Sequence, residues 1–194
     1  MSRYHLNGGL LTSSPSDIVI GIDPSLTGFA LTAMSASGDC FDTYLYRPKS
    51  RGVHRLVQIY DWVTDKFGEY EGSGHTITDS AIEDTVLHSY ASLVMGELSG
   101  TVKRSFFMYF DNKAKFPMKV PPSVVKKYAT GRGNAKKNEV MLAVYKSWGV
   151  EYSDDNMADS YVIAKIAAGC ADTTYRSTVI ENMADPKFRD DELT

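Results

Sequence analysis

The sequence of 194 residues predicts one mixed α/β domain, in which three strands, a helix, a strand, a helix, a strand and two helices follow one another. Two observations predict this fold class. Short apolar runs rich in β-branched residues, bounded by Gly, Pro, Ser or Asp, are typical of buried strands. Between and after these runs, apolar residues recur at steps of three and four, which is typical of helices that cover a sheet.

The first three strands are predicted close together in the sequence. Ile18–Asp23 is a β-branched apolar run that ends at the turn residues of 24–28. Phe29–Met34 and Phe41–Tyr46 follow, separated by the turn signal Ser37-Gly38-Asp39. The three runs therefore predict a β-meander.

The remaining predicted elements alternate between helices and strands. Their bounds are 54–67 (helix), 76–83 (strand), 91–106 (long helix), 116–120 (strand, ended by Pro121 and Pro122), 134–148 (helix, with Asn134 as N-cap) and 155–170 (helix). We expect residues 1–16 to be a flexible leader, 17–180 to form the folded domain, and 181–194 to be a polar tail.

The composition indicates a soluble protein with a sizeable core. Hydrophobic residues make up 43% of the chain and charged residues 23%, close to the usual values for globular domains. No apolar stretch reaches the roughly 18 residues needed to cross a bilayer, and the N-terminus lacks the pattern of a secretory signal. We therefore expect a cytoplasmic protein without membrane partners. Two isolated cysteines, Cys40 and Cys170, are too few for a disulfide framework.

The charges are segregated along the chain. Eight cations and no acidic residue lie between Lys113 and Lys137, so that removing them from the net charge of −3 leaves −11 for the rest. A basic segment of this kind suits phosphate neutralisation, although a lysine-rich surface can also be merely solvated. The glycines at its end favour the first interpretation, because Arg132 lies between Gly131 and Gly133, just before a predicted helix.

Three acidic residues follow or interrupt apolar runs at distant places in the chain. Asp23 ends the first strand, Glu83 ends the fourth, and Asp159 lies on the apolar stripe of the last helix. A buried carboxylate needs a partner, and a divalent cation is the simplest partner for several. Strand alternation sends Glu83 and Asp84 to opposite faces, so only one of them can face Asp23.

The start of the last helix adds two further polar groups. Steps of three and four residues back from Asp159 reach Asn156 and Asp155, which places them on the same inward face. Asp155 or Asn156 can instead cap the helix. Asp159 cannot be a cap, because it lies inside the helix.

Four blocks of sequence together resemble the RuvC-type Holliday junction resolvases, in particular the variants carried by phages. They are Gly-Ile-Asp-Pro-Ser-Leu-Thr-Gly (21–28), Ala-Ile-Glu (81–83), Lys-Lys-Tyr-Ala-Thr-Gly-Arg-Gly-Asn-Ala-Lys-Lys (126–137) and Asp-Asn-Met-Ala-Asp (155–159). They occur in the order found in that family. The resemblance implies an RNase H-like fold, with a five-stranded mixed sheet of a three-strand antiparallel meander plus two parallel strands, flanked by helices.

The resemblance also implies an acidic metal site. Its catalytic and metal-binding residues would be Asp23, Glu83 and Asp159, with a fourth ligand from the start of the last helix. Many family members have an aspartate or histidine at the position of Asn156. Either Asn156 coordinates through its carbonyl oxygen or Asp155 supplies the charge, and we favour Asp155 because a carboxylate holds a hard cation better than an amide.

The implied reaction is hydrolysis of a DNA phosphodiester with two Mg²⁺ ions, for which Mn²⁺ can substitute, leaving a 5′ phosphate and a 3′ hydroxyl. The implied partner is branched DNA, above all a four-way junction, in recombination or in clearing branches before genome packaging. The expected DNA-contacting residues are Lys126, Lys127, Arg132, Asn134, Lys136 and Lys137.

Family members act as homodimers, and the long helix after Glu83 resembles their dimerisation helix. Val86 stands where cellular members carry an aromatic wedge, so His88 or Tyr90 would have to take that role. Two other classes of function fit parts of the sequence: a junction-binding protein without catalysis, and an actin-like or sugar-kinase ATPase. The ATPase needs a second nucleotide-binding half and a second phosphate loop, which the sequence does not show.

Overall fold

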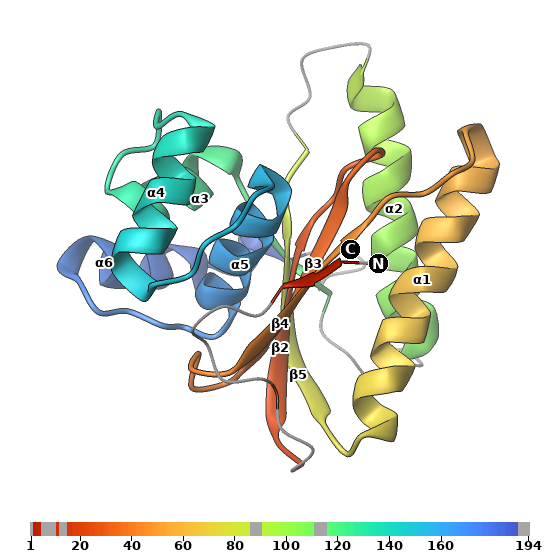
Figure 1. The fold of residues 1–194 in the computed structure, drawn as a ribbon, viewed down its shortest axis with the longest axis horizontal. Coiled ribbons are helices and arrows are strands. Elements are labelled where there is room, and N and C mark those ends of the chain that lie inside the picture. Colours follow the sequence, from red (N-terminus) through yellow and green to blue (C-terminus); the bar gives the residue numbers. More distant parts are fainter. Residues whose placement is uncertain (1, 5–10, 12–14, 86–90, 111–115, 190–194) are drawn as a thin grey trace.

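The computed structural model describes residues 2–4, 11, 15–85, 91–110 and 116–189. Its centre is a six-stranded sheet of order β1-β4-β3-β2-β5-β6 (Figure 1). The strands are β1 (Ser2–Tyr4), β2 (Asp17–Asp23), β3 (Phe29–Ser35), β4 (Phe41–Tyr46), β5 (Thr76–Glu83) and β6 (Met118–Val120). β2, β3 and β4 pair antiparallel, whereas β2, β5 and β6 are parallel. The predicted meander and the two parallel strands are thereby confirmed.

Helices cover both faces of the sheet. α1 (Gly52–Gly72) and α2 (Ala91–Tyr109) lie on one face, and α3 (Pro122–Thr130), α4 (Lys137–Trp148), α5 (Asp155–Ala167) and α6 (Thr174–Met183) lie on the other (Figure 1). A short 3₁₀ helix, η1 (Pro186–Phe188), follows α6. Two separate apolar cores result, one on each face. None of the helices in the described ranges is long and apolar enough to span a membrane.

Strand alternation decides which side chains face which core. Ile22 and Ile82 are register partners and belong to the core under α1 and α2. Ala81, one residue earlier on β5, belongs to the opposite core under α5. Because successive strand residues point to opposite faces, Asp23 and Glu83 both lie on the α5 face, at the same end of two neighbouring strands.

The structure differs from the expected boundaries at both ends. Within the expected leader, Ser2–Tyr4 forms β1 and pairs with the edge of β4, so the sheet has six strands rather than five. The boundary expected at residue 181 falls inside α6, where Met183 is buried. The guanidinium of Arg189 also donates to the carbonyl of Phe116, so the folded part continues to residue 189.

Two helices and one cap were not anticipated. α3 begins at Pro122, a residue that we expected only to end a strand, and proline at the first position of a helix is itself a start signal. α6 was also missed, since its polar residues form no apolar stripe. Asn134 does not cap α4, because that helix begins at Lys137 with Lys136 as its N-cap residue.

Candidate active site

The close approach of α5 to β2 positions two of the three acids. A Cβ atom added to Gly21 would lie 2.3 Å from the backbone nitrogen of Ala164 and 2.4 Å from the carbonyl oxygen of Ser160, so only glycine fits between strand and helix. The hydroxyls of Ser160 and Thr32 also hydrogen-bond at 2.9 Å. Asp23 stands two residues after Gly21 and Asp159 immediately before Ser160, so this contact brings both acids to the same end of the α5–β2 interface.

Asp23, Glu83 and Asp159 line one pocket of about 290 Å³. They come from the end of β2, the end of β5 and the first half of α5. The other lining residues are Pro24, Ser25, Met95, Pro122, Lys126, Lys137, Val140 and Asn156. The structure therefore brings the three sequence-predicted acids together with two of the predicted DNA-contacting lysines. Ser25, Met95 and Pro122 were not anticipated.

Burial and mutual repulsion strongly perturb the three carboxyl groups. Desolvation is the largest cause of the raised pKa of Asp23, followed by the charges of Glu83 and Asp159. Desolvation first, and then Asp159, raises the pKa of Glu83 to about 7. The pKa of Asp159 rises to about 6, again chiefly by desolvation, while Lys137 acts in the opposite direction. Clustered carboxyls with raised pKa values are typical of functional sites.

These raised pKa values predict that the metal-free protein loses stability as the pH rises. Between the pKa of an unfolded glutamate, 4.5, and about 7, folded Glu83 retains a proton that the unfolded chain releases. The free energy of unfolding must therefore fall across this window, by on the order of 3 kcal/mol for Glu83 alone. Thermal unfolding in a chelator should give a higher Tm at pH 5.5 than at pH 8, and Mg²⁺ should raise Tm mainly at pH 8.

Two variants make that measurement specific to the pocket. Asp23→Asn removes one of the repelling charges and should flatten the pH dependence between pH 5.5 and 8. Asp84→Asn removes an exposed acid beside Glu83 and should leave the dependence as it is. A metal-free wild type whose Tm is constant or increases over this range would contradict the assignment of these carboxyls as a buried, mutually repelling cluster.

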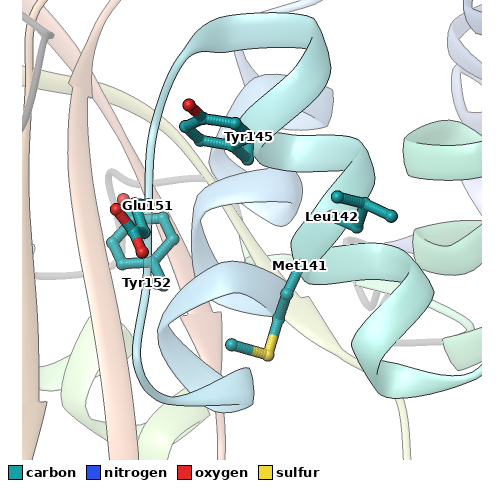
Figure 2. Close-up of a pocket in the computed structure, with 5 residues that line it drawn as sticks. All are labelled: Met141, Leu142, Tyr145, Glu151 and Tyr152. Carbon is teal, nitrogen blue, oxygen red and sulfur yellow. The ribbon is translucent and has the colours of Figure 1, made fainter.

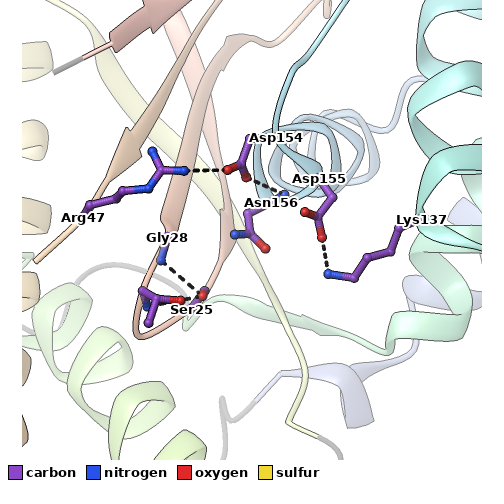
Figure 3. Close-up of polar contacts among 8 residues, drawn as sticks. Ser25, Gly28, Arg47, Lys137, Asp154, Asp155 and Asn156 are labelled. Atoms are coloured by element: carbon purple, nitrogen blue, oxygen red, sulfur yellow. Dashed lines mark hydrogen bonds and ion pairs between the residues drawn. The ribbon is translucent and has the colours of Figure 1, made fainter.

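Asp155 and Asn156, the two candidates for a fourth ligand, have different surroundings in the first turn of α5. Asp154, not Asp155 or Asn156, is the N-cap residue, and its Oδ1 accepts the backbone N–H of Asn156 at 3.0 Å. The carboxylate of Asp155 forms an ion pair with Lys137 (Figure 3). The Asn156 side chain lines the acidic pocket and lies against Gly28, where an added Cβ would be 2.8 Å from its Nδ2.

The predicted DNA-contacting residues lie on two helices and the turn between them. Lys126 and Lys127 are on α3, and Lys126 reaches the acidic pocket. In the turn, the guanidinium of Arg132 pairs with Glu139 at 2.9 Å, and Glu139 also accepts the backbone N–H of Lys136 at 2.7 Å. Asn134, Lys136 and Lys137 are exposed. Val86, His88 and Tyr90, the positions considered for a wedge, lie outside the described residues.

A second pocket, of about 480 Å³, is larger but lacks this chemistry. It lies between α4 and the segment before α5, and Met141, Leu142, Tyr145, Glu151 and Tyr152 line it (Figure 2). Glu151 is its one charged lining residue among those described, and the Tyr152 hydroxyl is hydrogen-bonded to Thr43 at 2.8 Å. The smaller acidic pocket is therefore the better candidate for an active site.

The residue types of the acidic pocket suit a divalent cation, but the side chains are not arranged around a common point where an ion would bind. Within the ranges that the structure describes, no group of three or more His, Cys, Asp or Glu side chains is arranged to hold a metal ion. The residue types do fit, because three carboxylates share one pocket and hard cations such as Mg²⁺ prefer oxygen ligands. Burial and the neighbouring acids raise the pKa values of Asp23 and Glu83, and a bound cation would offset both effects.

Comparison with solved structures identifies the fold class as RNase H-like and, within it, the fold of RuvC. A structure of Thermus thermophilus RuvC in complex with Holliday junction substrate matches at a TM-score of 0.57 and 22% identity, covering 76% of this chain and 90% of that chain. Another structure of Thermus thermophilus RuvC matches at a TM-score of 0.57 and 19% identity, over 89% of this chain and 98% of that one. No protein-family model and no curated protein matches the sequence.

Proposed function

We propose that this protein is a structure-selective endonuclease that cuts four-way and other branched DNA by metal-dependent hydrolysis of a phosphodiester. One observation carries the proposal: the buried carboxylate of Asp23 and the partly buried carboxylates of Glu83 and Asp159, from separate elements, line a single pocket beside Lys126 and Lys137. Structural packing alone gives no reason to gather three mutually repelling acids out of water. The likeness in fold to RuvC, which one matching structure shows with Holliday junction substrate, supports the same reaction.

The proposed roles follow from the chemistry of each group. Asp23, Glu83 and Asp159 would hold two Mg²⁺ ions, and Mn²⁺ could replace them. When bound, such ions activate water for attack on phosphorus and stabilise the leaving oxygen, which would give a 5′ phosphate and a 3′ hydroxyl. Lys126 and Lys137 would neutralise the phosphate beside the cut, because both residues line the pocket.

For the fourth ligand we propose Asp155, released from Lys137 when DNA binds. The ion pair that now joins Asp155 to Lys137 would exchange, so that Lys137 meets a phosphate and Asp155 meets the cation. Asn156 would remain a neutral part of the pocket wall. This exchange accounts for both residues without leaving either charge unpaired.

The proposed exchange predicts unequal effects of two substitutions. Asp155→Asn should lower the rate of junction cleavage by about a hundredfold, because a charged ligand is lost and Lys137 is set free. Asn156→Ala should lower the cleavage rate by less than about tenfold, since it removes only a neutral residue from the pocket wall. Single-turnover cleavage at saturating protein measures both. If Asn156→Ala lowers the cleavage rate more than Asp155→Asn does, Asn156 and not Asp155 is the fourth ligand.

A homodimer would place two such pockets on the symmetric strands of a junction. α2 offers a surface for this purpose: Leu98, Val102 and Phe106 are buried against α1 and the sheet, but Leu93 and Met108 are 72% and 54% exposed. Large apolar side chains exposed along one helix suit a contact between copies of the same chain. We propose that α2 forms this contact.

The decisive assay compares four-way, three-way and linear duplex DNA in the presence and absence of Mg²⁺. We expect cleavage that requires the cation and is fastest on branched substrates. The second candidate function is junction binding without catalysis, which the present arrangement of the acids favours, because no group of three among the described side chains holds an ion as placed. Tight junction binding with no cleavage in either Mg²⁺ or Mn²⁺ would establish that alternative.

A further inference from the structure

A second basic segment joins β4 to α1. Residues 47–55 contain Arg47, Lys49, Arg51 and Arg55, together with His54, and no acidic residue. We propose that this β4–α1 basic segment contacts the phosphates of a second duplex arm of branched DNA, on the side of the acidic pocket opposite to α3 and α4. The inference rests on the proposed function and extends it to a surface that the sequence analysis did not identify.

Strand register places the segment at the edge of the sheet that holds the acids. Asp23 pairs with Ala30 of β3, and Ala30 pairs with Leu45 of β4. β4 therefore runs parallel to β2, and Arg47 leaves β4 at the end where Asp23 leaves β2. Neighbouring strands lie roughly 4.8 Å apart, so the backbones of Asp23 and Leu45 are about 10 Å apart.

The cations of the segment are accessible. The Arg47 side chain is 64% exposed, and Lys49 and Arg51 are also exposed. Neither Lys49 nor Arg51 has a carboxylate partner in the part of the chain that the structure describes. The Nε of Arg55 donates to the carbonyl of Ser50 at 2.9 Å, which holds the segment against the start of α1. No acidic residue occupies the first turn of α1, so nothing there offsets the positive charge.

The two basic surfaces approach the site from opposite sides. Arg47 reaches the first turn of α5 from β4 and pairs with Asp154 at 2.9 Å, whereas Lys137 reaches the same turn from α4 and pairs with Asp155 (Figure 3). Asn156 of this turn, which lies between Arg47 and Lys137 in Figure 3, lines the acidic pocket together with Lys137. A strand held in the pocket would thus have positive charge on both flanks, and the arms of a junction diverge on both sides of its cut strand.

The chemistry of the segment indicates duplex phosphates as the ligand. Arginine and lysine side chains provide charge and forked donors that suit phosphate oxygens. Apart from His54, the segment contains no aromatic residue, and it has no Asn or Gln, so few of its side chains could read or stack bases and we expect contacts that are independent of sequence. An acidic protein surface is the competing partner, and junction binding that is unchanged by loss of Lys49 and Arg51 would favour it.

The test removes the charges of Lys49 and Arg51, which have no carboxylate partner among the described residues. In the full chain, Lys49→Gln with Arg51→Gln should weaken binding to a four-way junction by about tenfold or more at about 0.1 M salt. The slope of log affinity against log salt concentration should fall by about 1.8, since each lost phosphate contact contributes about 0.9. Binding to a linear duplex of equal arm length should weaken less. Fluorescence anisotropy measures the affinity for the junction, its dependence on salt and the affinity for linear duplex. A chelator in the buffer removes divalent cations and so prevents cleavage during the measurement.

A matched control removes two charges elsewhere. Lys146→Gln with Lys187→Gln eliminates exposed cations at the end of α4 and in η1, and should leave the salt slope for the junction unchanged. Two results would overturn the second-arm contact. In one, the variant with Lys49→Gln and Arg51→Gln binds the junction as tightly as wild type. In the other, its affinity for linear duplex falls by the same factor as its affinity for the junction. A wild type that binds no junction at all would instead overturn the proposed function.

Discussion

Asp23→Asn should abolish cleavage of a four-way junction while leaving junction binding intact. Asp23 is 5% exposed, ends β2 and faces both Glu83 and Asp159 across the pocket, so its carboxylate is the central member of the cluster. Replacing it with an amide of the same shape removes a charged cation ligand without opening a cavity. We expect a loss of at least about a thousandfold in the single-turnover rate, or about 4 kcal/mol of transition-state stabilisation.

Two readouts separate lost chemistry from lost folding. The metal-free Asp23→Asn variant should unfold at a higher temperature than wild type at pH 8, because one repelling buried charge is gone. It should also bind junction DNA at least as tightly, since it reduces negative charge near phosphates. Asp84→Asn, in an exposed neighbour of Glu83, should cut at the wild-type rate. Wild-type cleavage by Asp23→Asn would refute the assignment of the acidic pocket as the active site.

Gly21→Ala should disrupt both the fold and the site with one methyl group. The added Cβ would lie 2.3 Å from a backbone nitrogen of α5, so the whole helix must move away from β2. Overpacking against a backbone typically costs about 1–3 kcal/mol and occasionally more. Because Asp159 is carried by this helix, the movement would also separate it from Asp23. We expect a lower Tm together with a cleavage rate reduced by about a hundredfold or more.

Gly68→Ala is the matched control for this substitution. Gly68 is exposed inside α1, and an added Cβ would meet only the hydroxyl of Tyr109 at 3.6 Å. Alanine there should stabilise the helix by up to about 1 kcal/mol, so the same chemical change should act in the opposite direction. If Gly21→Ala leaves both Tm and cleavage at wild-type values, α5 is not held against β2 as described.

The sequence was sufficient to predict those features of the site that depend on local pattern. The β-branched run of β2 and the apolar run of β5 predicted that Asp23 and Glu83 each stand at the end of a strand. Helical spacing likewise placed Asp159 on the buried stripe of α5. Each of these inferences requires only the geometry of one element.

The features that the sequence did not predict depend on contacts between elements. The ion pair of Lys137 with Asp155 joins two helices, and no spacing rule connects residues 18 positions apart. Asp154 became the N-cap of α5 although Asp155 and Asn156 are equally suitable residue types. The β4–α1 basic segment was overlooked because its position beside the acids follows from strand register, which the sequence alone does not give.

Diffraction from crystals containing Mn²⁺ would show whether Asp23, Glu83 and Asp159 hold divalent cations in one pocket. Anomalous scattering should locate Mn²⁺ within about 2.5 Å of carboxylate oxygens from all three residues, with the side chains moved together relative to the present arrangement. Crystals of Asp23→Asn should show reduced or no Mn²⁺ there. A fully soaked wild-type crystal with an empty pocket, or with Mn²⁺ bound only elsewhere, would contradict the account.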